Sequence, residues 1–389
     1  MANRASSVVR RTALAVAVVL VCLIALGYTY RVYRLDQINK TLATPIGIDD
    51  RIFVTVGGIE QWITIRGRDR SNPLLLFLHG GPGNAFQSFT RRMFLDWERE
   101  FTVVQWDQRG AGKTFGRSGP VGAGVTLDRM VLDGAEVAEF VRQRLGKEKV
   151  ILLGLSWGSV LGVHLVKARP DLFYAYVGTG QVVSHRPGKL QAYTQLVAEA
   201  RARQDARAVR ELAAIGPPPY DSTEKSVVHT RWANRYEPSM PSNWTLLASV
   251  LFESDASIRD LRNLMAGIRS SEDHFRDMTD DVSLPALGAD FHVPVFVLQG
   301  ALDNVAPVEL LRPYLDGIRA PRKELILIPE AGHNAMATRS GDFLRLLVER
   351  VRPLAIQHGG KIEGPDRLCF SAHDDRPIHA PTRWPRAAP

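Results

Sequence analysis

Ser156 lies between two glycines in the stretch Gly154–Gly158, which reads GLSWG. This stretch matches the pattern G-x-S-x-G, in which a strand turns sharply into a helix and presents a serine hydroxyl at the turn. The apolar run from Lys149 to Leu153 predicts the strand, and the residues from Ser159 onward predict the helix. A helix N-terminus would place partial positive charge beside an anion formed at the serine. This context favours a nucleophilic serine over an ordinary Gly-Ser turn.

A nucleophilic serine needs a base and a carboxylate that orients the base. Asp303 follows the apolar run VPVFVLQG, and His333 follows the run ELILIP, so both are expected at strand ends. Taken singly, each could be a turn aspartate or a packed loop histidine. Their place in the chain, in the order serine, aspartate, histidine, is that of α/β-hydrolases. We therefore predict a triad of Ser156, Asp303 and His333.

Acyl transfer also needs two backbone N–H groups aimed at the oxyanion of the tetrahedral intermediate. The first is expected at Trp157, directly after the serine. The second is expected at Gly81, in the glycine-rich stretch HGGPG that follows the apolar run Leu74–Leu78. Glycines at this place would let the backbone approach a substrate closely.

The elements that must position these residues are short apolar runs, each ending in glycine or polar residues. An antiparallel hairpin is expected over 51–67, turning at Gly57-Gly58. Strands are then expected within 74–78, 101–112, 149–158, 172–180, 293–300 and 323–333, with helices over 127–145 and 340–351. This alternation predicts an α/β fold with a doubly wound, mostly parallel sheet and its site at the carboxyl ends of the strands.

Residues 183–291 interrupt the alternation, because they contain helical patterns and no clear strand. We expect an all-helical cap there, with helices over 190–214, 244–253 and 257–268. The hydrolase-type core would then consist of residues 51–182 and 292–356. The tail 357–389 is rich in glycine, proline and charge, and we expect little fixed structure in it.

The N-terminal stretch 12–30 is uncharged and flanked by arginines, with tyrosines at its end. Its length suits a helix that spans a bilayer, and tyrosines are typical of the membrane interface. We favour an uncleaved anchor, followed by a linker over 31–50, with the main domain outside the cytoplasm. A signal peptide cleaved after Ala25-Leu26-Gly27 remains an alternative, and would give a secreted or periplasmic protein.

Composition excludes several classes of protein. The 389 residues carry a formal net charge of +8, but the arginines are scattered, so no nucleic-acid partner is expected. Cys22 and Cys369 offer neither a disulfide framework nor a metal site, and the histidines lack the spacing of metal ligands. GAGKT is no phosphate loop, because Asp107 stands where that motif needs glycine. No metal and no cofactor are expected, and the oligomeric state stays open.

Three motifs together are similar to those of the proline iminopeptidase family of serine peptidases, within the α/β-hydrolase superfamily. They are HGGPG at 79–83, WDQRGAG at 106–112 and GLSWGS at 154–159. The resemblance implies release of an N-terminal residue, often proline, from a small peptide or amide through an acyl-enzyme on Ser156. It also implies that Asp107 and Arg109 support the oxyanion loop.

Members of this family hold the α-amine of the substrate with glutamates of the cap. The resemblance therefore makes Glu237, in the stretch WANRYE, a candidate amine anchor, with Glu253 as a second. One alternative is a carboxylesterase or lipase-like hydrolase of a lipophilic ester, which would need no amine anchor. A non-catalytic membrane scaffold on a hydrolase fold is the third hypothesis.

Overall fold

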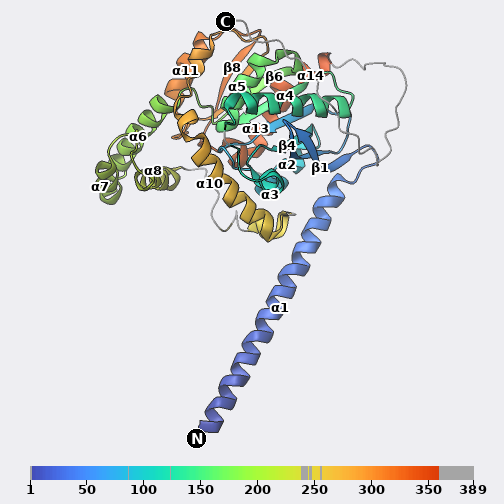
Figure 1. Cartoon of the computed structure of the whole chain (residues 1–389), viewed down its shortest axis with the longest axis vertical. Coiled ribbons are helices and arrows are strands. Elements are labelled where there is room, and N and C mark those ends of the chain that lie inside the picture. Colours follow the sequence, from blue (N-terminus) through green and yellow to red (C-terminus); the bar gives the residue numbers. More distant parts are fainter. Residues whose placement is uncertain are drawn as a thin grey trace.

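A single sheet forms the centre of the body. The computed structural model describes residues 2–85, 87–122, 124–237, 244, 248–254 and 256–358, and within them eight strands pair in the order β1-β2-β4-β3-β5-β6-β7-β8. Helices cover both faces of this sheet, and a long helix projects from the body (Figure 1). The strands are β1 (Ile48–Val56), β2 (Ile59–Gly67), β3 (Leu74–Leu78), β4 (Thr102–Asp107), β5 (Val150–Leu155), β6 (Phe173–Thr179), β7 (Val295–Gly300) and β8 (Lys323–Ile328).

The strand directions confirm the predicted α/β sheet. β1 and β2 form the expected antiparallel hairpin, and β2 also pairs antiparallel with β4. From β4 to β8 all neighbouring strands are parallel. Their carboxyl ends therefore lie along one edge, and the Gly-rich and polar stretches that follow them meet there.

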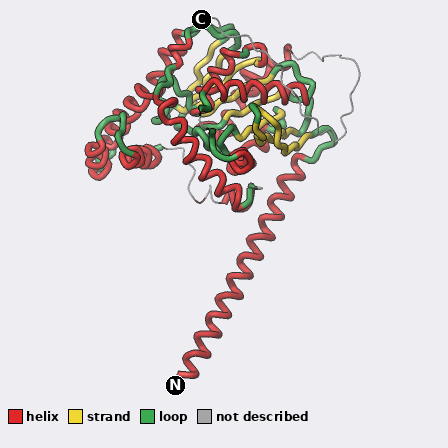
Figure 2. The backbone as a smooth tube through the Cα atoms, in the orientation of Figure 1, coloured by secondary structure: helices red, strands yellow, loops and turns green. Residues whose placement is uncertain are grey.

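Each face of the sheet has its own apolar core, because side chains alternate along a strand. In β3, Leu76 packs into one core and Phe77 into the other. The first core is covered by α4 (Leu127–Arg144), α5 (Trp157–Ala168) and α11 (Val308–Gly317). The second is covered by α2 (Gln87–Trp97), α13 (Ser340–Leu346), the π-helical turn η4 (Leu347–Val351) and α14 (Arg352–His358). Figure 2 shows the strands enclosed between these two helical layers.

Four further short helices lie between these elements in the described part of the chain. They are α3 (Gly112–Ser118), η1 (Pro170–Leu172), η3 (Leu284–Leu287) and α12 (Ala335–Thr338).

The insertion between β6 and β7 is helical, as its sequence indicates. Its helices are α6 (His185–Ala202), α7 (Ala206–Ile215), α8 (Thr223–Tyr236), η2 (Ser249–Glu253) and α10 (Ile258–Asp280). Three of them, α6, α7 and α8, share a small apolar core that includes Leu212 and Trp232.

Three details of the predicted cap are wrong. The helix expected over 190–214 is divided, because Asp205 caps a new helix by accepting a hydrogen bond from the Ala208 N–H. The helix expected over 257–268 continues to Asp280. Helix α8 was not expected at all. Tertiary contacts stabilise these helices and override the weak local helix signals of a polar sequence.

Helix α1 (Ala2–Leu42) contains the apolar N-terminal stretch and corrects the expected linker over 31–50. The helix continues to Leu42 and β1 begins at Ile48, so only 43–47 connect them. Beyond Arg31 the apolar residues Val32, Leu35 and Ile38 recur at helical spacing, and Ile38 is buried against the body. Apolar side chains from Leu14 to Leu26 are 53% to 71% exposed. By length and composition α1 could cross a membrane, and a signal sequence would pass the same test.

The predicted disordered tail, 357–389, lies almost entirely outside the described residues. Its first two residues belong to α14, which ends at His358.

Candidate active site

The turn between β5 and α5 holds Ser156 in a backbone conformation with positive φ, which residues other than glycine rarely adopt. Its φ is 54° and its ψ is −120°, and its N–H donates a hydrogen bond of 3.0 Å to the Thr179 carbonyl at the end of β6. A Cβ on Gly154 would lie 2.3 Å from the Gly158 oxygen, and a Cβ on Gly158 would lie 2.1 Å from the Leu78 oxygen. Neither flanking position therefore has room for a side chain.

Ser159 fixes this turn from behind. Its hydroxyl donates to the Ser156 carbonyl over 2.6 Å and accepts from the Val182 N–H over 3.1 Å. The hydroxyl of the buried Tyr176 donates to the Ser159 carbonyl over 2.9 Å. The Ser156 backbone is thus bonded to Thr179 directly and to Val182 through Ser159, and both of these residues lie where the chain leaves β6 for the cap.

Asp303 and His333 form a direct pair at the neighbouring strand ends. His333 Nδ1 lies 3.1 and 3.0 Å from the two carboxylate oxygens of Asp303. The carboxylate is fully buried and accepts hydrogen bonds from the backbone N–H groups of Val305 and Ala306. Gln299 donates a further bond to Oδ2 over 2.6 Å. The aspartate therefore caps its own turn and orients the histidine at the same time.

The His333 ring lies against Gly180, the residue that follows the hydrogen-bond partner of the Ser156 N–H. A Cβ on Gly180 would lie 2.8 Å from the His333 Cε1 atom and 3.3 Å from Nε2. Because Nδ1 faces Asp303, Nε2 is the nitrogen left to accept a proton. Burial lowers the pKa of His333, but Asp303 and, more weakly, Glu237 outweigh it and raise the pKa above its usual 6.5.

The glycine loop after β3 is joined to the turn at Ser156 through Gln108. The side chain of Gln108 donates to the His79 carbonyl over 3.1 Å and accepts from Trp157 Nε1 over 3.1 Å. The Gln108 N–H donates to His79 Nε2 over 3.2 Å. Burial lowers the pKa of His79 to about 4, so this histidine stays neutral. Gly81, with φ of 117°, lies two residues further along this loop.

The predicted supports Asp107 and Arg109 flank Gln108 in the chain. Asp107 accepts a hydrogen bond from the Lys113 N–H over 2.8 Å. Arg109 pairs with the fully buried Asp133 on α4 at 2.8 Å. Sequence reasoning missed Gln108, although its place between these two residues in DQRG was the available signal.

The family model described as alpha/beta hydrolase fold matches residues 73–340. The chain belongs to this family. It is similar to the probable aminopeptidase YbaC of Bacillus subtilis, with 29% identity over 308 residues that cover 77% of this chain and 95% of the relative. It is also similar to the proline iminopeptidase of Neisseria meningitidis, with 26% identity over 301 residues, covering 72% and 88%.

Solved structures agree on the fold of the hydrolase. The proline iminopeptidase of Mycobacterium smegmatis superposes with a TM-score of 0.59 at 20% identity, covering 79% of this chain and 99% of the other. A bacterial membrane phospholipase A superposes with a TM-score of 0.57 at 16% identity, covering 91% and 99%.

A cavity of about 370 Å³ opens above Ser156, between the sheet edge of the hydrolase and its cap. Gly81 and Trp157 line it from the core, and Lys189 and Glu272 line it from the cap. An outer cavity of about 920 Å³ shares Gly81, Lys189 and Glu272 with it, so the two adjoin. Their size suits a small organic substrate or a short peptide.

The two glutamates predicted as amine anchors are placed differently. Glu237 lies at the end of α8, where its Oε1 accepts a hydrogen bond of 2.8 Å from the His333 N–H. It therefore contacts the loop of the histidine and does not line either cavity. Glu253 ends η2, which packs on α1 and α2 away from both cavities, and its side chain lies outside the described residues.

Glu272 is the cavity-lining carboxylate that sequence reasoning missed. It lies on α10, beyond Ile268, where the helix was expected to end. Burial and the charge of Asp273 raise the pKa of Glu272, although Arg276 opposes them. Continuing the helical period past Ile268 would have placed Glu272 on the same helix as Thr279, which also lines the cavity.

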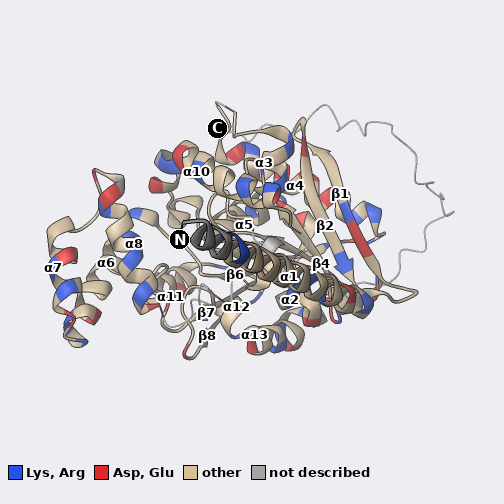
Figure 3. Cartoon of the chain, turned by 90° about the horizontal axis from the view of Figure 1, so that it is seen from below, with Lys and Arg blue, Asp and Glu red and all other residues tan. Residues whose placement is uncertain are grey.

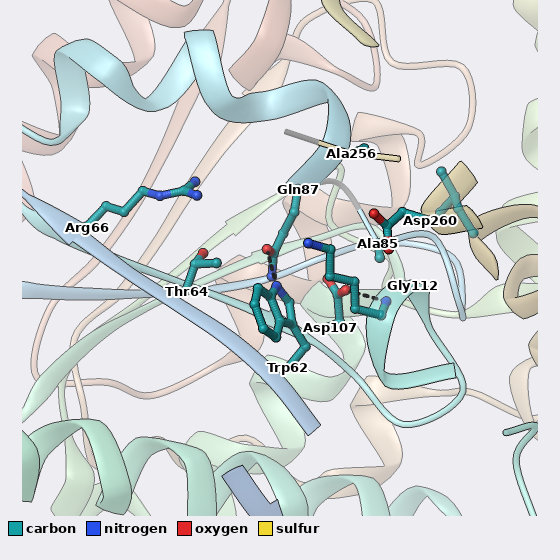
Figure 4. Close-up of a pocket in the computed structure, with 11 residues that line it drawn as sticks. Trp62, Thr64, Arg66, Ala85, Gln87, Asp107, Gly112, Ala256 and Asp260 are labelled. Atoms are coloured by element: carbon teal, nitrogen blue, oxygen red, sulfur yellow. Dashed lines mark hydrogen bonds between the residues drawn. The ribbon is translucent and has the colours of Figure 1, made fainter. Parts of the chain in front are cut away.

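A third, much smaller pocket is lined by residues that include Asp107 and Gly112 (Figure 4). Its volume is about 20 Å³, which is room for about one water molecule. In it, Gln87 accepts from Trp62 Nε1 over 3.0 Å and donates to the Gln105 carbonyl over 3.2 Å. This pocket is too small for a substrate.

Gln108→Ala tests the link between the glycine loop and Ser156. We expect kcat/KM to fall by about 10- to 100-fold, because misplaced backbone donors lose transition-state stabilisation. Gln87→Ala is the matched control, since that amide also joins a tryptophan Nε1 to a backbone carbonyl. Steady-state kinetics and thermal unfolding of both variants check this. Equal kinetic losses in the two would contradict a positioning role for Gln108.

Proposed function

We propose that the chain is a serine hydrolase of the proline iminopeptidase type, releasing the N-terminal residue of a small peptide or amide. The observation that carries the proposal is the Asp303–His333 pair beside the strained turn of Ser156, under a cavity that the cap closes. The names of the similar aminopeptidases support the choice of substrate class.

In the proposed reaction, Ser156 Oγ attacks the carbonyl carbon while His333 Nε2 takes the hydroxyl proton. Asp303 stabilises the imidazolium that forms, and the N–H groups of Trp157 and Gly81 hold the oxyanion. The C–N bond breaks when His333 returns the proton to the leaving amine. Water then attacks the acyl-enzyme with the same histidine as base, and Ser156 regains its proton.

Recognition of the α-amine is proposed to fall to Glu272, with Glu237 in a supporting role. Glu272 borders the cavity that also contains Ser156. Glu237 fixes the His333 backbone and raises the pKa of that histidine. An ammonium group in the cavity would meet a carboxylate in a partly dry site, where charge pairing is strong.

One observation favours a second candidate, an esterase or lipase-like hydrolase. The outer cavity has an apolar side that includes Pro187, Leu190, Pro219 and Val227. A lipophilic acyl or alcohol group would be accommodated there without an amine anchor. This candidate uses the same Ser156 chemistry and differs only in substrate.

We also propose that α1 holds the hydrolase on a membrane, with its catalytic domain outside the cytoplasm. Cleavage after Gly27 is the alternative, and would leave residues 28–42 attached to the body.

Ser156→Ala should lower kcat by on the order of 10⁴-fold, because the remaining site keeps only binding and oxyanion stabilisation. The variant should also lose labelling by a fluorophosphonate probe. Ser118→Ala, on α3, should be labelled like the wild type. Labelling of Ser156→Ala at the wild-type rate would show that another residue is the nucleophile.

Activity should be lost as the pH falls through the pKa of His333, because a protonated imidazole cannot accept the serine proton. Since Asp303 raises that pKa, the acidic limb of kcat/KM should lie above pH 6.5. In Asp303→Asn the limb should move to lower pH, and kcat should fall by about 10⁴-fold. The pH profile of kcat/KM for both proteins checks this. A limb that stays in place in the variant would contradict the assignment.

Glu272→Gln should reduce kcat/KM for proline-β-naphthylamide by about 10- to 100-fold, because it removes one charge-assisted hydrogen bond. Its effect on p-nitrophenyl acetate, which has no amine, should be small. Glu237→Gln should impair both substrates, because it disturbs His333. Glu199→Gln, an exposed glutamate of α6, is the control. Hydrolysis of the ester without any hydrolysis of the amide by the wild type would favour the esterase.

A further inference from the structure

The part of α1 around Tyr30 and Arg31 is docked on the cap. The Arg31 guanidinium donates hydrogen bonds to the carbonyls of Leu251 over 2.8 Å and Ala256 over 3.0 Å. The rings of Tyr30 and Phe252 meet edge to face, 5.2 Å apart. These contacts fix the position of residues 249–254 and 256 along the axis of α1.

In a membrane crossed by α1, these contacts would place residues 249–254 and 256 at the membrane surface. The uncharged stretch 12–30 spans about 28 Å as a helix, close to the ~30 Å of bilayer hydrocarbon. Tyr30 and Arg31 therefore fall at its boundary on the side of the body. Because they contact Phe252 and Leu251, the turn η2 lies at that boundary too.

Helix α10 begins immediately after this segment, at Ile258, and its outer face combines apolar and basic side chains. Ile258 is 72% exposed and Met265 is 53% exposed. Arg259, Arg262 and Arg269 are exposed as well. With 100° per residue, these five positions fall within one arc of the helix, opposite the buried Leu264, Gly267 and Ser271. Figure 3 looks at this side of the molecule, with α1 running toward the viewer and α10 beside it.

We propose that the outer face of α10, Ile258–Arg269, rests on the surface of the membrane that α1 crosses and binds anionic lipid headgroups. Interfacial helices bind lipid through apolar side chains, which enter the boundary of the acyl chains, and through basic side chains, which attract anionic headgroups. Continuity with α1 through Arg31 and Tyr30 selects a lipid surface as the occupant. The proposal rests on retention of α1 and is independent of the substrate of the hydrolase.

The inner face of the same helix reaches the active site. A Cβ on Gly83, in the glycine loop, would lie 2.8 Å from the Gly267 oxygen, and the Ser271 hydroxyl donates to the Gly110 carbonyl over 3.1 Å. Further along, Glu272 lies on the same side of the helix as Met265, at 100° per residue, and borders the substrate cavity. The proposed membrane contact would therefore hold the cap helix that closes the site.

The test uses the full chain, with Cys22→Ser and Cys369→Ser, reconstituted in vesicles. A fluorophore is attached at Met265→Cys, or at Leu132→Cys on α4 as the matched control. Vesicles contain phosphatidylcholine with about 30% phosphatidylglycerol, plus a lipid with a nitroxide headgroup. We expect about threefold stronger quenching at position 265 than at position 132, because only the former would lie among headgroups. Intact mass first establishes whether α1 is present.

A second variant tests the role of charge. Changing Arg259, Arg262 and Arg269 to Gln should reduce the quenching at position 265 toward that in pure phosphatidylcholine. Changing Arg144, Arg345 and Arg350 to Gln, three exposed arginines of other helices, should leave it unchanged. Equal quenching at positions 265 and 132 would overturn the proposal. A fluorescence change at position 265 that follows the protein-to-lipid ratio instead of the nitroxide lipid would indicate a second protein copy and would also overturn it. Recovery of a chain that lacks α1 would overturn it as well.

Discussion

The active site depends on one close contact between the start of α5 and the end of β3. Gly158 lies so near the carbonyls of Leu78 and His79 that no side chain fits between them. This contact brings the turn of Ser156 and the glycine loop to the same point of the sheet edge. Gln108 then ties the two together by hydrogen bonds. The proposed nucleophile and oxyanion donors need a fixed relation to each other, and this backbone packing would provide it.

The cap contributes charged side chains to the lining of the cavity above Ser156. Glu272 and Lys189 face the cavity from two cap helices, whereas the Asp303–His333 pair belongs entirely to the core. The family assignment rests on the core, which matches the alpha/beta hydrolase model. The same core could serve a peptidase or an esterase, because both form an acyl-enzyme. The choice between them therefore depends on whether the cap supplies a charge for an amine.

Helix α10 joins three parts of the molecule. Its first turns follow the segment that binds Arg31 of α1, its middle packs on the glycine loop at Gly83, and its last turns border the cavity. Such a helix would transmit a change at the membrane side to the substrate side, since a packed helix moves as a unit.

The sequence alone predicted the sheet and the strand-to-helix turn at Ser156, because apolar strands and glycine turns are local patterns. It also predicted Asp303 and His333 as partners of the serine, and the structure places these two side chains in direct contact. It did not determine the cap boundaries or the role of Gln108. Those depend on contacts between residues far apart in the chain, such as Gln108 with Trp157 or Arg31 with Leu251. Glu237 shows the limit most clearly. Its sequence suggested a substrate anchor, but the end of α8 brings its carboxylate to the His333 backbone, a pairing that only the tertiary fold could decide.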